Sequence, residues 1–310
     1  MPKVSVIMNC YNGESFLREA INSVISQSFT DWEIIFWDNQ STDSSAEIVK
    51  SYDNSRIKYF RSPEFTSLGE ARRNAVNVAQ GEWIAFLDSD DIWRPNKLMV
   101  QMTALEGTDY VFAYAGILEI TADGVPLRSV IPRYTSGNLL ENLLNQFEVN
   151  MVTPVIRRNF LVEQKINFEP EITASEEYNI FVRLAARGHV LVQKEILGSY
   201  RVYPGSLTDR NISRWAIERR LTLNQLIMEV PSVREEYASA FREAEMRGYY
   251  YEARYLMAEG DLKEAKNIMR IIGSSDWKYK LLEASLYLPG LWNLLHNLKI
   301  RRKLLSILRL

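Results

Sequence analysis

The segment WIAFLDSDD, residues 83–91, runs from five apolar residues straight into a cluster of acids. An uninterrupted apolar run of this length, followed by polar residues, is typical of a strand buried on both faces of a sheet. In open α/β sheets, ligands bind beyond the carboxyl ends of the strands. Asp88 and Asp90 are therefore the first candidates for a binding site.

Strand and helix patterns alternate through the N-terminal half of the chain. Apolar segments predict three further strands, over 4–8, 32–37 and 57–60. Apolar residues at helical spacing predict helices over 17–25, 44–52 and 69–78. This alternation indicates an α/β fold, with a mainly parallel sheet flanked by helices.

The pattern changes in the second half of the chain. Residues 110–119 favour a strand interrupted at Gly116, and residues 176–187 favour a helix closed by Gly188 in the C′ position. After about residue 211 the strand pattern stops. Helices are predicted there over 215–228, 235–247, 249–259 and 262–271. We therefore expect an N-terminal domain, residues 1–210, and an α-helical C-terminal region, residues 211–310.

Composition excludes several classes of protein. With 46% hydrophobic and 25% charged residues among 310, the chain is neither disordered nor fibrous. Its 37 Lys and Arg against 39 Asp and Glu remove the electrostatic case for a nucleic-acid binder. One cysteine, Cys10, excludes an intramolecular disulfide and a cysteine-rich zinc site. The absence of a signal-peptide pattern and of an apolar span favours a cytoplasmic protein.

Polar clusters follow three of the predicted strands. They lie at 9–12, 38–43 and 88–91, and none of them is a glycine-rich phosphate-binding loop. Carboxylates repel phosphate, so Asp88 and Asp90 become useful to a phosphorylated ligand only if a divalent cation bridges the two. Mg²⁺ and Mn²⁺ suit that role because both bind carboxylate and phosphate oxygens together.

Residues 4–12, 38–43 and 86–93 together resemble family 2 inverting glycosyltransferases of the GT-A fold, and the likeness runs from Lys3 to about Thr208. The resemblance implies a metal-dependent transfer of a sugar from a nucleotide-sugar donor, a UDP-sugar by expectation, to a hydroxyl of a glycan or lipid-linked glycan. Mn²⁺ or Mg²⁺ would be the cofactor.

The resemblance also implies roles for single residues. Tyr11 would stack on the nucleotide base, and Asp38 would accept a hydrogen bond from it. Asp88 would contact the ribose, Asp90 would hold the metal, and Arg72 would face the diphosphate. The plainer alternative for Tyr11 is that it covers a strand end.

A fourth cluster, residues 175–183, resembles the acidic pair with which a helix of this family begins. The second acid of the pair is normally an aspartate that acts as the base; here it is Glu177, preceded by the substrate-binding Glu176. The structural alternative is a helix start in which Ser175 or Thr173 is the N-cap and both acids complement the helix dipole.

The sequence departs from the family pattern in places. Tyr203 stands where many members have a histidine that helps to bind the metal or diphosphate. Arg73 replaces a usual asparagine and is a rival of Arg72 for the diphosphate. Trp93 resembles a residue near the acceptor site, although a position in the core is the alternative.

Two other functions are compatible with parts of the pattern. Residues 87–90 also resemble the nucleophile motif of haloacid-dehalogenase-type phosphatases, but that motif lies on a first strand and this one on the fourth. A non-catalytic nucleotide-sugar-binding scaffold, with a helical half that recruits partners, is the other alternative.

The C-terminal segment, residues 290–310, is basic and amphipathic. The chain has no acidic residue from Ala284 onward. Apolar residues surround the five cations of the segment, Lys299, Arg301, Arg302, Lys303 and Arg309. Such a helix lies in the interface of an anionic membrane or packs against the protein or a second subunit. The first alternative would place the enzyme at the inner face of the cell membrane, and the second allows a homo-oligomer.

Overall fold

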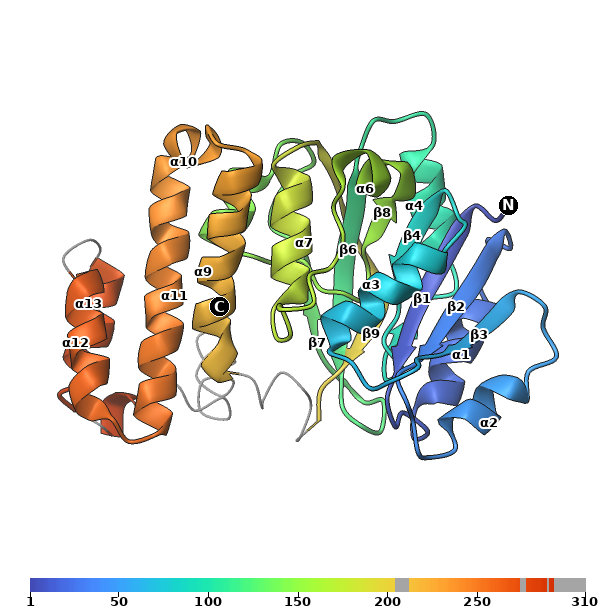
Figure 1. Cartoon of the computed structure of the whole chain (residues 1–310), viewed down its shortest axis with the longest axis horizontal. Helices are drawn as coiled ribbons and strands as arrows, with labels where there is room; N and C mark the ends of the chain where they lie inside the picture. The colour runs from blue at the N-terminus through green and yellow to red at the C-terminus, as the bar shows by residue number, and fades with distance from the viewer. Residues whose placement is uncertain (204–211, 274–276, 289, 293–310) are drawn as a thin grey trace.

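The computed structural model describes residues 1–203, 212–273, 277–288 and 290–292. Its N-terminal part is a single nine-stranded sheet with helices on both faces, and helices alone make up the C-terminal part (Figure 1). The expected boundary near residue 210 and most of the basic segment 290–310 lie outside the described residues.

The sheet has the order β3-β2-β1-β4-β8-β6-β9-β5, with β7 paired to β6. Its strands are β1 (Val4–Cys10), β2 (Trp32–Asp38), β3 (Ile57–Arg61), β4 (Trp83–Phe86), β5 (Ile92–Trp93), β6 (Phe112–Ile120), β7 (Pro126–Val130), β8 (Val155–Arg157) and β9 (Val190–Arg201). The first four strands are parallel to one another, as predicted, and β6 is parallel to β9. The other pairs are antiparallel, so the sheet is mixed.

Helices cover both faces of this sheet, and each face has its own core. They are α1 (Leu17–Ile25), α2 (Ser45–Lys50), α3 (Leu68–Val78), α4 (Lys97–Leu105), α5 (Leu140–Asn145), α6 (Arg158–Gln164) and α7 (Glu176–Ala185). Ile7 of β1 packs in the core with α3, α5 and α7, while Val6 and Met8 pack in the core with α1, α2 and α4. This alternation along β1 is what a strand buried on both faces requires.

The C-terminal helices extend the molecule beyond α7. They are α9 (Ile212–Glu229), α10 (Val233–Glu236), α11 (Ala238–Ala258), α12 (Leu262–Gly273) and α13 (Trp277–Ser285). α9 lies beside α7, α11 beside α9, and α12 and α13 are outermost (Figure 1). Within the described residues, no helix is both long and apolar enough to cross a bilayer.

Three predictions from the sequence need correction. The expected helices 235–247 and 249–259 are replaced by the short α10 and by the single helix α11, which passes through Gly248. The strand expected at 110–119 is not interrupted at Gly116, although its register with β9 shifts there. Gly188 does not have the positive φ of a C′ glycine; a Cβ there would collide with Val111, so close packing explains this glycine.

Candidate active site

The acidic loop after β4 is fixed by the end of β9. Asp91 is buried, and its Oδ1 accepts a hydrogen bond from the Arg201 backbone N–H at 2.8 Å. The Arg201 guanidinium donates to the backbone oxygen of Asp90 at 2.8 Å and to Glu19 Oε2 at 2.7 Å. The loop is therefore held to β9 and to α1 by one buried arginine.

Asp90 is in contact with Tyr203, the residue that stands where the family often has histidine. The Tyr203 hydroxyl donates to Asp90 Oδ2 at 2.9 Å. Burial, together with the charge of Asp88, raises the pKa of the Asp90 carboxyl. The loop thus concentrates negative charge at a strand end, which is an environment that attracts a cation.

Arg72 joins the acidic loop to the acidic pair of α7. It is only 3% exposed, and it lies in α3. Its guanidinium donates to Asp88 Oδ1 at 2.7 Å and to Glu176 Oε1 at 2.7 Å. Asp88 and Glu176 are 88 residues apart in sequence (176 − 88), yet one side chain contacts both. The structure therefore brings three of the predicted site residues together.

Glu177 lies in the first turn of α7, next to Glu176. Burial, and then the charge of Glu176, raise the pKa of the Glu177 carboxyl to about 8. A carboxyl group with a pKa in this range can both take up and release a proton near neutral pH, which is the property of a general base or acid.

The capping alternative for this acidic pair is wrong in one respect. Ser175 occupies the N-cap position of α7, but its side chain makes no capping hydrogen bond. Its hydroxyl, like that of Thr173, donates instead to Glu218 of α9. The N-terminus of α7 is therefore held by another helix.

Tyr11 follows the end of β1, and Asp38 is the last residue of β2, where it lies opposite Cys10. Tyr11 is 53% exposed, and its ring lies 4.7 Å from that of Phe65, edge to face. Asp38 is fully buried and accepts hydrogen bonds from the Ser41 N–H at 2.7 Å and the Tyr59 hydroxyl at 2.6 Å. The two residues thus combine an open aromatic surface with a fixed carboxylate.

Trp93 lies in the core. It is 2% exposed, its indole N–H donates to the Val152 carbonyl at 2.8 Å, and the Lys97 ammonium lies 3.9 Å from its ring centre. The core alternative describes this position, and contact with an acceptor would require the side chain to move.

The acidic loop after β4 fits a divalent cation that is shared with a phosphate-bearing ligand. The described part of the chain has no group of three or more His, Cys, Asp or Glu side chains that could hold a metal among themselves. Magnesium sites in nucleotide enzymes, however, usually take one or two carboxylates and complete their shell with substrate phosphates. Asp88 and Asp90 provide hard oxygen ligands of that kind.

Two structural residues of the site were not identified from the sequence. Arg201 lies in the stretch that was singled out for Tyr203 alone, and Glu218 lies in the helical region, outside the resemblance. Neither forms a local motif, because each acts on residues more than 40 positions away. Only the tertiary structure reveals the two contacts.

Solved structures support the fold. Residues 1-349 of S. aureus TarS, in complex with UDP-GlcNAc, superimpose with a TM-score of 0.69 over 94% of this chain and 89% of that TarS chain, at 19% identity. The mannosyltransferase PcManGT of Pyrobaculum calidifontis, in complex with GDP-Man and Mn²⁺, superimposes with a TM-score of 0.54 over 96% of this chain and 88% of PcManGT, at 13% identity. At these identities the likeness establishes the GT-A fold alone.

Sequence comparison establishes the family. The UDP-Glc:alpha-D-GlcNAc-diphosphoundecaprenol beta-1,3-glucosyltransferase WfgD of Escherichia coli is 33% identical over 158 residues, which are 51% of this chain and 61% of WfgD. The model of the family described as "Glycosyl transferase family 2" matches residues 5–165. Since this match spans more than half of the chain, the protein belongs to glycosyl transferase family 2 and is a glycosyltransferase (EC 2.4).

Proposed function

We propose that the protein transfers a sugar from a UDP-sugar to a hydroxyl of a glycan or lipid-linked glycan, with inversion, in polysaccharide biosynthesis. The observation that carries this proposal is the contact of Arg72 with both Asp88 and Glu176, because it joins the donor end of the sheet to the helix that bears Glu177. The relatives support the donor class: TarS is seen with UDP-GlcNAc, and WfgD is named for UDP-Glc.

The donor would lie across the ends of β1, β2 and β4. Tyr11 would stack on the base through its exposed ring. Asp38 would accept a hydrogen bond from the base, as a carboxylate can from uracil, once its buried side chain is uncovered. Asp88 contacts the ribose. Arg72, whose guanidinium is held by Asp88 and Glu176, adds positive charge beside the diphosphate. Asp90 would hold Mn²⁺ or Mg²⁺, which when bound neutralises charge on the leaving diphosphate.

The reaction is a single displacement. The Glu177 carboxylate takes the proton of the acceptor hydroxyl, whose oxygen forms a bond to the anomeric carbon. The bond from that carbon to the diphosphate oxygen breaks, and UDP leaves with the electron pair. Attack opposite the leaving group turns an α-linked donor into a β-linked product. Glu176, held by Arg72, would bind substrate beside the base.

WfgD is named for a diphosphoundecaprenol acceptor, which supports a lipid-linked acceptor here and a role for the basic segment 290–310 at an anionic membrane. Membership of the glycosyltransferase family favours sugar transfer over the phosphatase and scaffold alternatives.

The test is release of UDP from a panel of UDP-glucose, UDP-GlcNAc and UDP-galactose, with GDP-mannose as the control nucleotide. Water replaces the unknown acceptor, and Glu177→Gln is assayed beside the parent protein. We expect release from at least one UDP-sugar by the parent, reduced in Glu177→Gln by at least the ~10²-fold that a general base contributes. Turnover by Glu177→Gln at the parent's rate would refute the role of Glu177.

A further inference from the structure

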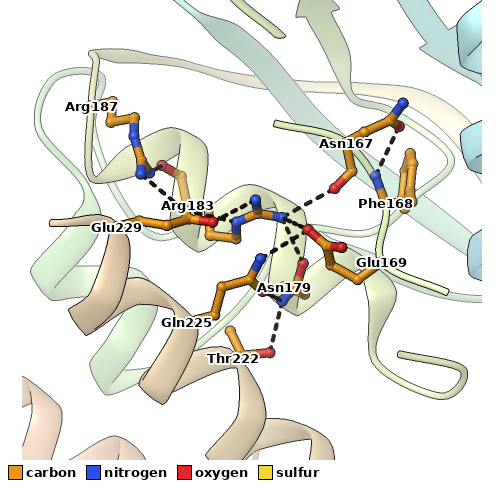
Figure 2. Close-up of polar contacts among 9 residues, drawn as sticks. All are labelled: Asn167, Phe168, Glu169, Asn179, Arg183, Arg187, Thr222, Gln225 and Glu229. Carbon is orange, nitrogen blue, oxygen red and sulfur yellow. Dashed lines mark hydrogen bonds and ion pairs between the residues drawn. The ribbon is translucent and has the colours of Figure 1, made fainter. Parts of the chain in front are cut away.

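One face of α9 runs along α7 and the loop before it. Glu218, Thr222, Gln225 and Glu229 are spaced by four, three and four residues, so their side chains share one side of the helix. Every one of them hydrogen-bonds to α7 or to the segment just before it. Figure 2 shows the contacts of the last three. The helical region therefore holds the element that carries Glu177.

Glu218 holds the end of α7 at which Glu177 lies. The Glu218 side chain is completely buried. Its Oε1 accepts from the Thr173 N–H at 2.8 Å and from the Thr173 hydroxyl at 3.0 Å. Its Oε2 accepts from the Ala174 N–H and the Ser175 hydroxyl, both at 2.9 Å. These donors immediately precede Glu176 and Glu177, so one carboxylate fixes the path by which the chain enters α7.

Glu218 needs its charge to do this. Burial alone would raise its pKa, but the hydrogen bonds from Thr173, Arg214, Ala174 and Ser175 outweigh it and lower the pKa of the Glu218 carboxyl. Each partner of the two Glu218 carboxylate oxygens is an N–H or O–H group that donates to them. A glutamine at this position would place an NH₂ group against the backbone N–H of Thr173 or of Ala174, with which it cannot hydrogen-bond, and only the neighbouring hydroxyl could turn to accept from it.

We propose that Glu218 is a positioning residue for Glu177, through which the helical C-terminal region completes the active site of the N-terminal domain. The inference rests on the proposed function, in which Glu177 is the base. General-base catalysis requires the carboxylate to lie within hydrogen-bond reach of the proton that it takes, and a displacement of about 1 Å can cost about 10²-fold in rate.

The opposite end of α7 supplies a matched control. Arg183 is buried and donates to Glu229 Oε1 at 2.7 Å and Oε2 at 3.1 Å, and Arg187 donates to Glu229 Oε2 at 2.8 Å (Figure 2). Glu229 thus belongs to the same interface as Glu218, and it also receives hydrogen bonds from several donors. It contacts α7 six residues or more after Glu177 (183 − 177), away from the catalytic end.

The experiment measures UDP release from the best UDP-sugar for the parent protein, Glu218→Gln, Glu218→Asp and Glu229→Gln, with unfolding midpoints for all four. We expect Glu218→Gln to lower kcat by about 10- to 100-fold while KM for the donor stays within about twofold. Glu218→Asp, which keeps the charge, should recover part of kcat. Glu229→Gln should lower the unfolding midpoint as much as Glu218→Gln does, yet keep the parent's kcat.

Parent-like kcat in Glu218→Gln, or an equal loss of kcat in Glu229→Gln, would overturn the positioning role. If Glu218→Gln does not fold, the double variant Thr173→Val, Ser175→Ala removes only the two hydroxyl donors, and a smaller loss of kcat at constant KM is expected.

Glu177→Gln in the same assay separates the positioning role of Glu218 from the proposed function. If Glu177→Gln turns over normally, the proposed function fails; if it is inactive while Glu218→Gln is normal, only the positioning role fails.

Discussion

Arg72 lies almost completely buried between two carboxylates, Asp88 and Glu176, that come from distant segments of the chain. Burial by itself would lower the pKa of its guanidinium, but the charges of Asp88 and Glu176 outweigh burial and raise it, so Arg72 is a fixed cation. The pair of Arg72 with Glu176 is buried on both sides. Removing one partner of a buried ion pair typically costs about 3–5 kcal/mol of folding stability. The arrangement keeps the acids of two clusters within reach of one ligand.

Glu177 should give the enzyme a distinctive pH dependence. Burial and the charge of Glu176 raise its pKa to about 8, so in the free enzyme the carboxyl is largely protonated at pH 7 and ionises as the pH rises. A base acts only when ionised, so kcat/KM for UDP-sugar hydrolysis should fall about tenfold per pH unit below about pH 8. A pH–rate profile from about pH 6 to about pH 9 measures this limb; a profile that stays flat down to pH 6 would contradict the assignment.

Asp90 should make turnover depend on a divalent cation. Its carboxylate and that of Asp88 offer hard oxygens beside a predicted diphosphate. We expect Asp90→Ala to abolish UDP release while its circular dichroism spectrum and unfolding midpoint stay near those of the parent. Excess chelator should have the same effect on the parent protein, and added Mn²⁺ or Mg²⁺ should restore its activity. Full activity in chelator would remove Asp90 from the metal site.

At the scale of elements, the sequence predicted those strands and helices that a local apolar pattern determines. β1, β2 and β4 were predicted because each is a short apolar run, and their polar ends located Asp38, Asp88 and Asp90 correctly at strand ends. β9 was missed because Gln193, Lys194 and Glu195 interrupt its apolar pattern. β9 pairs with β6, and no local sequence signal reveals this pairing. Glu218 was not predicted either, because its role also depends on contacts between distant segments.

Two helical glycines should respond oppositely to substitution by alanine. A Cβ at Gly69 in α3 would lie 2.5 Å from the Ile172 carbonyl oxygen and 2.9 Å from that of Glu169, so backbone must move. Gly69→Ala should destabilise the protein by about 1–3 kcal/mol. A Cβ at Gly248 in α11 meets only the Arg219 side chain, at 3.6 Å, and the Ala216 carbonyl oxygen, at 4.0 Å. Gly248→Ala should therefore stabilise by up to about 1 kcal/mol. Urea unfolding measures both; the same sign for both would contradict the packing at one of them.

At the scale of the whole molecule, the α/β part carries the proposed donor site, and the helical part contacts the helix that bears the proposed base. The change from strands to helices could be predicted from the sequence, while the expected boundary near residue 210 lies outside the described residues. The dependence of the first part on the second could not, since buried polar contacts such as Arg183 with Glu229 have no sequence signature. The two regions are therefore joined along α7 by polar contacts and by a shared apolar core, in which Leu223, Leu226 and Phe241 pack with residues of α7.

The basic segment 290–310 should bind anionic membranes, an expectation that comes from its sequence alone. Each cation near an anionic surface contributes about 1 kcal/mol, and apolar residues lie between the cations. The full chain should pellet with phosphatidylserine liposomes at low salt, and a chain ending at Tyr287 should stay in the supernatant. Equal binding by both, or a truncated chain that only changes its oligomeric state, would count against membrane docking.

The most direct test of the account is the configuration of the sugar that leaves the enzyme. Proton NMR of UDP-α-sugar hydrolysis at high enzyme concentration distinguishes the two anomers before they equilibrate. If Glu177 activates the attacking oxygen on the face opposite the diphosphate, the β-anomer should appear first, and Glu177→Gln should produce it at least ~10²-fold more slowly. First appearance of the α-anomer, or parent-like rates in Glu177→Gln, would contradict a single displacement with Glu177 as its base.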